Sequence, residues 1–432
     1  MRFLKHSLLL LAACAVFGGT VSAQGKPQKG AQVGDIDSKA DPCNDFFQFA
    51  NGKWRSDNPI PASMVHWSRR WKAGEDAKEQ LKGILDDVSR KTDWPRGSVE
   101  ELISDYYGSC MNEAVVNKLG LAPAKPMLAK IDAMKTPADL QGMIRQLNDI
   151  FVLVPFVLTS SPDNHNPTQT IASISAGGLG LPDRDYYLKT EPRFQDARDK
   201  YLVHVAAMFK LAGYDNAKAK AAAQTVFQME KKLAEASLDN VALRDPQATD
   251  HKTTFADLKK LAPAVDWDGY FSTAKLSRAD LNVAEPKFLQ EVDRQVRETP
   301  MADWKTYLKW QFVHSLADQL SDPFVNENFA FYGKYLNGAT ELKPRWKRCA
   351  ETTDQLLGEA LGKKYVEKYF PPEAKTRAQE MVKNILAAMH DTIEGLEWMG
   401  PETKKKALEK LSTFNPKIGY PDKWKDYSNI KM

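Results

Sequence analysis

The fold is organised around Gly177-Gly178-Leu179-Gly180-Leu181-Pro182-Asp183-Arg184-Asp185-Tyr186-Tyr187-Leu188, a turn-rich stretch between a short β-like region and a long series of amphipathic helices. Its glycines allow backbone angles that are closed to other residues, and Pro182 fixes its own φ. Asp183 and Asp185 can accept hydrogen bonds from nearby backbone amides. The stretch therefore predicts a rigid corner. It contains no nucleophile and no metal cluster, so on its own it indicates architecture rather than chemistry.

The one β-like region precedes this corner. Residues 151–158 are apolar and rich in β-branched side chains, residues 161–164 favour a turn, and residues 170–174 alternate. Elsewhere apolar residues recur at helical spacing. Helices are expected at residues 99–115, 198–212, 217–236, 255–261, 287–298, 302–320, 352–369 and 374–399. The predicted fold class is mainly α, a multi-helix domain with one small β-hairpin near residues 151–175.

Composition narrows the function. The chain has 432 residues, of which 43% are hydrophobic, so it can bury a large core. Its 60 basic and 56 acidic residues are spread along the sequence and leave a net charge of +4. The sequence has no cluster of basic residues, which argues against nucleic-acid binding. Beyond the N-terminus no apolar run reaches about 18 residues, so no membrane span is expected in the mature chain.

The first 23 residues are typical of an export signal. Basic residues precede an apolar run at 8–17, and Val21-Ser22-Ala23 suits a signal peptidase that cleaves after Ala23. Leu11-Ala12-Ala13-Cys14 also resembles a lipoprotein box, in which Cys14 would be lipidated. Both alternatives predict an exported protein, periplasmic or secreted.

The rest of the chain divides into two parts. Residues 24–40 are small, polar and lysine-bearing, and are expected to form a flexible leader. Residues 41–432 are expected to form the folded domain. This part contains Cys43, Cys110 and Cys349. In an oxidising compartment an odd number of cysteines means one pair and one leftover thiol, or an intermolecular bond.

Local motifs give little support for catalysis. A helical zinc site needs two histidines one turn apart, and no two of the seven histidines lie within four positions of each other. His390 and Glu394 are one turn apart, but such a pair is typical of a solvated helix face. The sequence has no G-x-S-x-G, and the glycines at 177–180 lack the spacing of a phosphate loop. Zinc binding by this chain alone is therefore not expected.

The run from Gly178 to Tyr187 closely resembles the signature of the neprilysin and endothelin-converting-enzyme family of zinc metallopeptidases, which includes bacterial PepO-type enzymes. Further segments resemble other parts of that family in the family's order. They are Asp41-Pro42-Cys43-Asn44-Asp45-Phe46-Phe47, Gly52-Lys53-Trp54, Pro344-Arg345-Trp346-Lys347-Arg348-Cys349, Trp398-Met399 with Glu402-Thr403-Lys404, and Lys417-Ile418-Gly419-Tyr420-Pro421. The resemblance runs from about residue 35 to the end of the sequence.

The resemblance implies a helical N-terminal half that closes a chamber around small peptides. In the family the zinc ligands are the histidines of H-E-x-x-H and a downstream glutamate, which would lie beyond Met432. We therefore expect no cofactor in this chain, zinc in the full-length family, and no activity of the chain alone.

The resemblance also implies roles for single residues. The family pairs the cysteines that correspond to Cys110 and Cys349, which leaves Cys43 unpaired. A family arginine that contacts the free carboxylate of the substrate corresponds, without gaps, to His66, which is followed by Arg69 and Arg70. An ordinary charged helix face is the alternative for these two arginines.

Three hypotheses for the function follow. The chain is the lid half of an exported peptidase, or a stand-alone module that binds small peptides or docks on a separately encoded catalytic half, or a truncated gene product without an independent role. DNA downstream of codon 432 that encodes H-E-x-x-H would favour the first hypothesis.

Overall fold

The computed structural model describes residues 33–91 and 93–430. The signal-peptide and lipidation predictions, Cys14 included, and most of the predicted leader lie outside the described residues. The chain divides into two compact units, Met1–Pro61 and Ala62–Met432. Each unit is described by itself.

The described part of the first unit contains a 3-10 turn, η1 (Val33–Asp35), and one helix, α1 (Phe46–Asp57). The helix begins at Asp45, whose side chain accepts a hydrogen bond from the backbone N–H of Gln48. Cys43 lies just before this cap, and its thiol is free and exposed.

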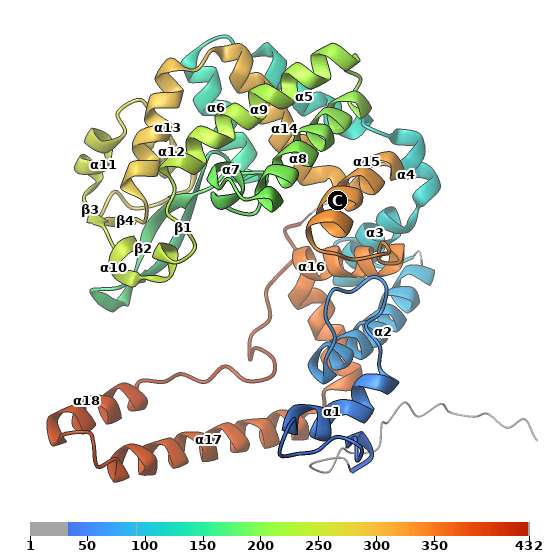
Figure 1. The fold of residues 1–432 in the computed structure, drawn as a ribbon, viewed down its shortest axis with the longest axis vertical. Coiled ribbons are helices and arrows are strands. Elements are labelled where there is room, and N and C mark those ends of the chain that lie inside the picture. The colour runs from blue at the N-terminus through green and yellow to red at the C-terminus, as the bar shows by residue number, and fades with distance from the viewer. Residues whose placement is uncertain (1–32, 92, 431–432) are drawn as a thin grey trace, which may run out of the picture. The chain divides into compact units, whose positions relative to one another are not determined.

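The second unit is built mainly from helices (Figure 1). Its elements in chain order are α2 (Arg69–Arg90), α3 (Val99–Met111), α4 (Glu113–Leu119), η2 (Ala122–Ala124), α5 (Lys125–Ala133), α6 (Pro137–Asp149), β1 (Phe156–Asp163), β2 (Asn166–Ala176), α7 (Asp185–Leu188), α8 (Pro192–Leu211), α9 (Asn216–Ala236), η3 (Ala242–Arg244), α10 (Pro246–Thr249), β3 (Lys252–Thr253), α11 (Phe255–Leu261), α12 (Trp267–Thr273), β4 (Leu281–Val283), α13 (Pro286–Glu298), α14 (Met301–Leu316), η4 (Ala317–Gln319), α15 (Asp322–Asn328), the π-helix η5 (Phe329–Leu336), α16 (Arg345–Tyr369), α17 (Pro372–Gly395) and α18 (Pro401–Ser412).

The strands form one small sheet in the order β1-β2-β4-β3. β1 and β2 are the expected hairpin, and they pair antiparallel. β4 pairs parallel with β2 and antiparallel with β3. Figure 1 shows the sheet beside α10 and α11.

Three hydrophobic clusters make up the core of this unit. The first covers the sheet with α5, α6 and α11–α14, and the second joins α7–α9, α14, α15 and η5. α9 and α14 contribute to both of these clusters, so the two regions share their central helices. The third cluster is formed by α2, α3 and α16.

The stretch at 177–188 is held by hydroxyl groups of tyrosines from helices that follow it in the chain. Tyr307 Oη donates to the carbonyl oxygen of Gly178 at 2.8 Å, and Tyr332 Oη donates to that of Gly180 at 2.8 Å. Gly178 has a φ of +73°, and a Cβ at Gly180 would overlap the Tyr201 hydroxyl. Glycine is required at 178 for its backbone angle and at 180 for space.

Glu230 on α9 ties the same stretch to the core. Its carboxyl group accepts hydrogen bonds from Tyr187 Oη at 2.9 Å, Tyr201 Oη at 2.8 Å, Trp310 Nε1 at 3.2 Å and Gln311 Nε2 at 3.0 Å. The residue has no exposed surface, and burial raises its pKa to about 8. Tyr187 Oη, which donates to Glu230, also accepts a hydrogen bond from the backbone N–H of Leu181. The buried carboxyl group of Glu230 is thereby linked to both Leu181 and Tyr187 in this stretch.

The predicted fold class, mainly α with a small hairpin, is confirmed. Several predicted boundaries differ. α8 begins at Pro192 and α16 at Arg345, six and seven residues before the predicted starts, and α14 and α17 end at Leu316 and Gly395, four residues before the predicted ends. The hairpin turn lies at residues 163–166 rather than 161–164, so Pro162 is within β1. The helix expected over 99–115 ends at Met111, because Asn112 ends α3 and its side chain caps α4 by accepting from Val115 N. No helix among the described residues has the length and apolar character needed to cross a membrane.

Candidate functional site

The predicted carboxylate contact at His66 lies in a pocket of about 420 Å³. The pocket opens between the segment before α2, the π-helix η5 and the start of α16. His66 contacts the ring of Trp71 edge-on, with 4.4 Å between ring centroids. Arg69 and Arg70 are exposed in the first turn of α2 and do not line this pocket. The structure therefore separates His66 from the two arginines that follow it.

Backbone contacts fix the rim of the pocket. The carbonyl oxygen of Ala62 accepts hydrogen bonds from Thr340 N at 2.9 Å, Glu341 N at 3.1 Å and Thr340 Oγ1 at 2.9 Å. These bonds join the segment before α2 to the loop between η5 and α16. As a result, Ser63 to His66 are held beside Lys343 and Arg348, although about 280 residues separate them in sequence.

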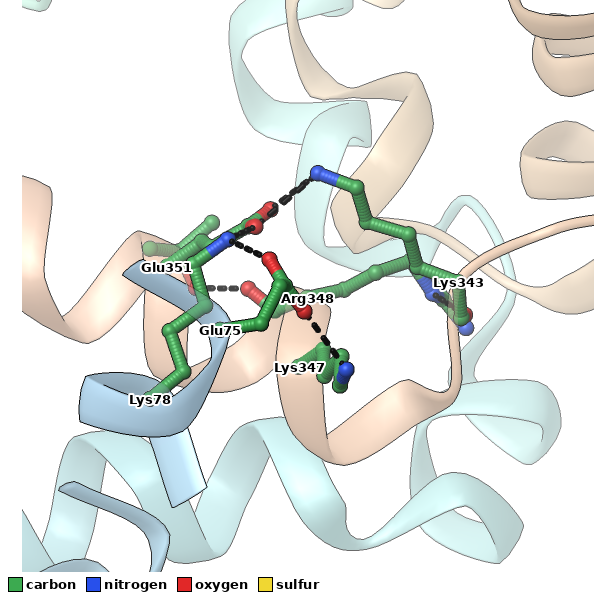
Figure 2. A network of polar contacts seen from close by, with 7 residues as sticks. Glu75, Lys78, Lys343, Lys347, Arg348 and Glu351 are labelled. Carbon is green, nitrogen blue, oxygen red and sulfur yellow. Dashed lines mark hydrogen bonds and ion pairs between the residues drawn. The ribbon is translucent and has the colours of Figure 1, made fainter. Parts of the chain in front are cut away.

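A network of charged side chains lies behind this rim (Figure 2). Lys347 Nζ donates to Glu75 at 2.6 Å, and Lys78 Nζ donates to Glu75 at 2.8 Å and to Glu351 at 2.7 Å. Lys343 Nζ also belongs to the network, because it donates hydrogen bonds of 2.9 and 3.0 Å to the two Glu351 carboxylate oxygens. The network joins α2 to α16, and its members are half-buried, so each pair is worth more than an exposed one.

Hydrogen bonding keeps both carboxyl groups of this network ionised. Burial pushes the pKa of Glu75 and Glu351 upward, but the hydrogen bonds from the lysines outweigh it, and both pKa values lie below the ordinary one. Burial alone would lower the pKa of Lys78, but its bonds to Glu351 and Glu75 outweigh this effect and raise it. Glu75, Glu351 and Lys78 are therefore all charged at neutral pH.

Arg348 adjoins this network without a carboxylate of its own. Its Nε donates to the carbonyl oxygen of Lys343 at 3.3 Å. Within residues 33–91 and 93–430 no carboxylate lies within 4.0 Å of its guanidinium group. Burial, with the positive charge of Arg345, holds the pKa of Arg348 below its usual range, although the group stays charged.

A second pocket, of about 540 Å³, lies on the other side of Arg348. Its walls come from α3, α4 and α16 and include the disulfide between Cys110 and Cys349, whose Cα atoms are 5.7 Å apart. Arg345 Nε donates to the carbonyl oxygen of Cys110 at 2.8 Å. Arg348 is thus part of the wall between two pockets, one rimmed by His66 and one by the disulfide.

The described residues do not offer a ligand set suited to zinc. One group of three possible ligands is present, His390, Asp391 and Glu394, all exposed on α17. His390 Nδ1 lies 3.5 Å from Asp391 Oδ1 and 3.9 Å from Glu394 Oε2, as in an ordinary solvated helix face. A zinc site of the H-E-x-x-H type requires two imidazoles on one helix, and this chain has no such pair.

Sequence reasoning missed two residues of the site. The sequence marks Arg348 only as part of a cysteine-containing segment, and it gives no signal for Trp71. Burial and the lack of a carboxylate partner arise from contacts between α16, η5 and the segment before α2, so local sequence carries no trace of them. The pocket places the cation of Arg348 next to aromatic surface, and its lining also includes the carboxylates of Asp318, Glu341 and Glu351.

Comparisons with known proteins agree on one family. The model described as Peptidase family M13 matches residues 42–421. The chain is 28% identical to endothelin-converting enzyme 1 of Mus musculus over 404 residues, covering 90% of this chain and 52% of that protein. It is 27% identical to endothelin-converting enzyme-like 1 of Mus musculus, covering 96% of this chain and 56% of that protein. The chain thus spans about half the length of these curated relatives.

Solved structures show the same fold. Zinc metalloprotease ZMP1 of Mycobacterium tuberculosis, in complex with an inhibitor, superposes with a TM-score of 0.86 at 30% identity, covering 93% of this chain and 61% of that one. PepO of Lactobacillus rhamnosis superposes with a TM-score of 0.78 at 20% identity, covering 89% and 60%, which supports the fold alone.

Proposed function

The chain belongs to peptidase family M13, and we propose that it supplies the helical half of an exported zinc metalloendopeptidase that encloses small peptides. The observation that carries the proposal is a single family match that runs from residue 42 to residue 421. The superposition on zinc metalloprotease ZMP1 over 93% of this chain supports it. The role of this half is to shape the chamber and to hold the peptide.

Bond cleavage requires residues that this chain does not supply. In the family, zinc activates a water molecule and polarises the scissile carbonyl group. The described residues do not fit a zinc site of that type. We propose that the chain by itself binds peptides without hydrolysing them.

The test is hydrolysis of a fluorogenic peptide by the purified chain, with and without added zinc. We expect no hydrolysis, together with retained peptide binding. Cleavage that appears with zinc and disappears with a chelator would overturn the proposal of inactivity. Cleavage restored by adding a zinc-binding domain of this family as a second polypeptide would support the lid function.

An exposed apolar stripe is the face that we propose for docking the catalytic half, whether in the same chain or separately encoded. Met381, Ile385 and Met389 recur on one side of α17 and are 59%, 56% and 49% exposed. No residue of α17 or α18 is buried. Isolated apolar residues are common on protein surfaces, but a stripe at helical spacing indicates a buried face.

The docking proposal is tested with Ile385→Glu and Met389→Glu. Both should leave thermal unfolding unchanged and abolish association with a zinc-binding domain. Lys383→Glu, on the same helix but outside the stripe, is the matched control. Equal association of all three variants would contradict docking at this face, and the stand-alone peptide-binding module would then be favoured.

Export remains part of the proposal. The N-terminal sequence and the disulfide between Cys110 and Cys349 suit an oxidising compartment. Mass spectrometry of the mature N-terminus would distinguish cleavage before Gln24 from a lipidated Cys14. An intact Met1 would contradict both alternatives.

Of the three residues predicted to contact the substrate carboxylate, we propose His66 alone for this role. Of the three residues predicted for this role, His66 lines the pocket, whereas Arg69 and Arg70 do not. An imidazole cannot form the bidentate pair of hydrogen bonds that a guanidinium group forms with a carboxylate. His66 alone is therefore a weak site for an anion, and the pocket needs a stronger cation.

A further inference from the structure

Arg348 is the cation that this pocket offers without an internal partner. Each lysine of the network behind the rim has at least one carboxylate from Glu75 or Glu351 at 2.6 to 3.0 Å. Among the residues that the structure describes, the Lys343 carbonyl oxygen, at 3.3 Å, is the one hydrogen-bond acceptor of the Arg348 guanidinium. Arg345 lies nearby but faces its own acidic neighbours, Asp322 at 3.8 Å and Glu113 at 4.0 Å.

Electrostatics favour an incoming anion at this place. Desolvation and the charge of Arg345 act against the charged form of Arg348, and Asp318, Asp322 and Glu113 offset this only from beyond ion-pair distance. An arginine does not lose its proton in this range, so the cost of its burial stays in the folded protein. A carboxylate that reached the guanidinium would recover that cost through a bidentate, charge-assisted pair.

The other walls of the pocket suit the remaining parts of a peptide. Trp71, Phe329 and Tyr332 supply aromatic surface for an apolar side chain. Asn328, which also lines the pocket, has a side-chain carbonyl oxygen that is buried and has no donor among the described residues. A peptide N–H could supply that donor, since buried acceptors are normally satisfied.

We propose that Arg348 binds a carboxylate group of a peptide in the His66 pocket, with Trp71, Phe329 and Tyr332 around the neighbouring apolar side chain. This inference rests on the proposed function and adds a specificity-determining residue to it. The same chemistry could come from the C-terminal carboxylate or from an acidic side chain.

The experiment measures binding to the full chain by titration calorimetry. The probes are N-acetyl-Ala-Phe with a free carboxylate, the same dipeptide as its C-terminal amide, and N-acetyl-Ala-Asp-amide. We expect the free carboxylate to bind at least about tenfold more tightly than the amide, as charged hydrogen bonds allow. If the acidic side chain is the ligand, N-acetyl-Ala-Asp-amide shows this advantage instead. Equal affinity for all three probes would refute the inference.

Variants locate the contact. Arg348→Gln should remove the preference for a carboxylate, and Arg348→Lys should retain part of it. Arg90→Gln, at the exposed end of α2 and outside the pocket, is the matched control and should bind as the unmodified chain does. Thermal unfolding of each variant shows that it is folded. A preference that survives Arg348→Gln would overturn the inference.

The two proposals fail in different ways. Peptide binding that is insensitive to the carboxylate and to Arg348→Gln would refute this inference and leave the lid function intact. No binding of any peptide would refute both.

Discussion

The burial of the Glu230 carboxyl group predicts that the free energy of unfolding depends on pH. Replacing Glu230 with Gln keeps the size of the side chain and removes its titration. The four side chains that donate to Glu230 come from α7, α8 and α14, so the folded protein cannot expose this group without opening the second hydrophobic cluster. Its pKa in the folded state is therefore set by burial rather than by solvent.

The magnitude follows from the two pKa values. Burial raises the pKa of Glu230 to about 8, against 4.5 for an ordinary glutamate. Between these values the folded protein holds a proton that the unfolded chain has released, so the free energy of unfolding falls as pH rises. Each pH unit is worth about 1.4 kcal/mol. From about pH 5.5 to about pH 7.5, the stability of the wild-type chain relative to Glu230→Gln should fall by about 2.7 kcal/mol.

The assay is urea unfolding followed by tryptophan fluorescence, because Trp310 donates directly to Glu230. Comparing two variants at each pH cancels the titration of all other groups. Glu235→Gln, on the same helix and exposed beside Lys231, is the control and should show no such trend. A difference between wild type and Glu230→Gln that does not change with pH, or that grows in favour of wild type as pH rises, would refute the reasoning.

Three further predictions concern stability. Removing the disulfide in the double variant Cys110→Ala/Cys349→Ala should lower the free energy of unfolding by about 5 kcal/mol, because the bond closes a loop with a sequence separation of 239. A free energy from urea unfolding that lies within about 1 kcal/mol of the wild-type value would contradict this. Gly180→Ala should destabilise the chain by about 1 to 3 kcal/mol in urea unfolding, since its Cβ would overlap a buried tyrosine hydroxyl. Gly74→Ala on α2, where a Cβ meets nothing within 4 Å, should instead stabilise the chain by about 0.5 to 1 kcal/mol in the same assay. Burial, together with the charge of a nearby histidine, lowers the pKa of His314 to about 4, so stability should fall as pH drops from 6.5 toward about 4; His314→Phe should lose this acid dependence, and an equal acid response in both chains would speak against it.

Much of the architecture could be read from local pattern. The helical periods predicted most long helices, since one apolar face repeats within each segment. The short strands β3 and β4 could not be predicted. They have two and three residues, and β4 pairs with β2 more than 100 positions earlier in the sequence. No local alternation reveals a pairing of that kind.

The site was less accessible to sequence reasoning than the fold. The resemblance identified the stretch at 177–188 but not what it contacts. Glu230 lies 43 residues after Tyr187 on a helix, and nothing in its local sequence marks it as buried. Local sequence does not mark Arg348 either, because the property that distinguishes it is the lack of a carboxylate partner among the described residues. Such properties depend on how α2, η5 and α16 pack, and a single sequence does not encode them in a local form.

The bond between Cys110 and Cys349 also bears on how the chain responds to proteases. The two cysteines enclose residues 111–348, which contain the sheet and the first two hydrophobic clusters. A single cut at any exposed loop within this span leaves both fragments covalently joined. A nicked molecule would therefore run as one band on a gel without reductant and as two bands with it. Backbone cleavage and loss of the folded unit therefore become separate events.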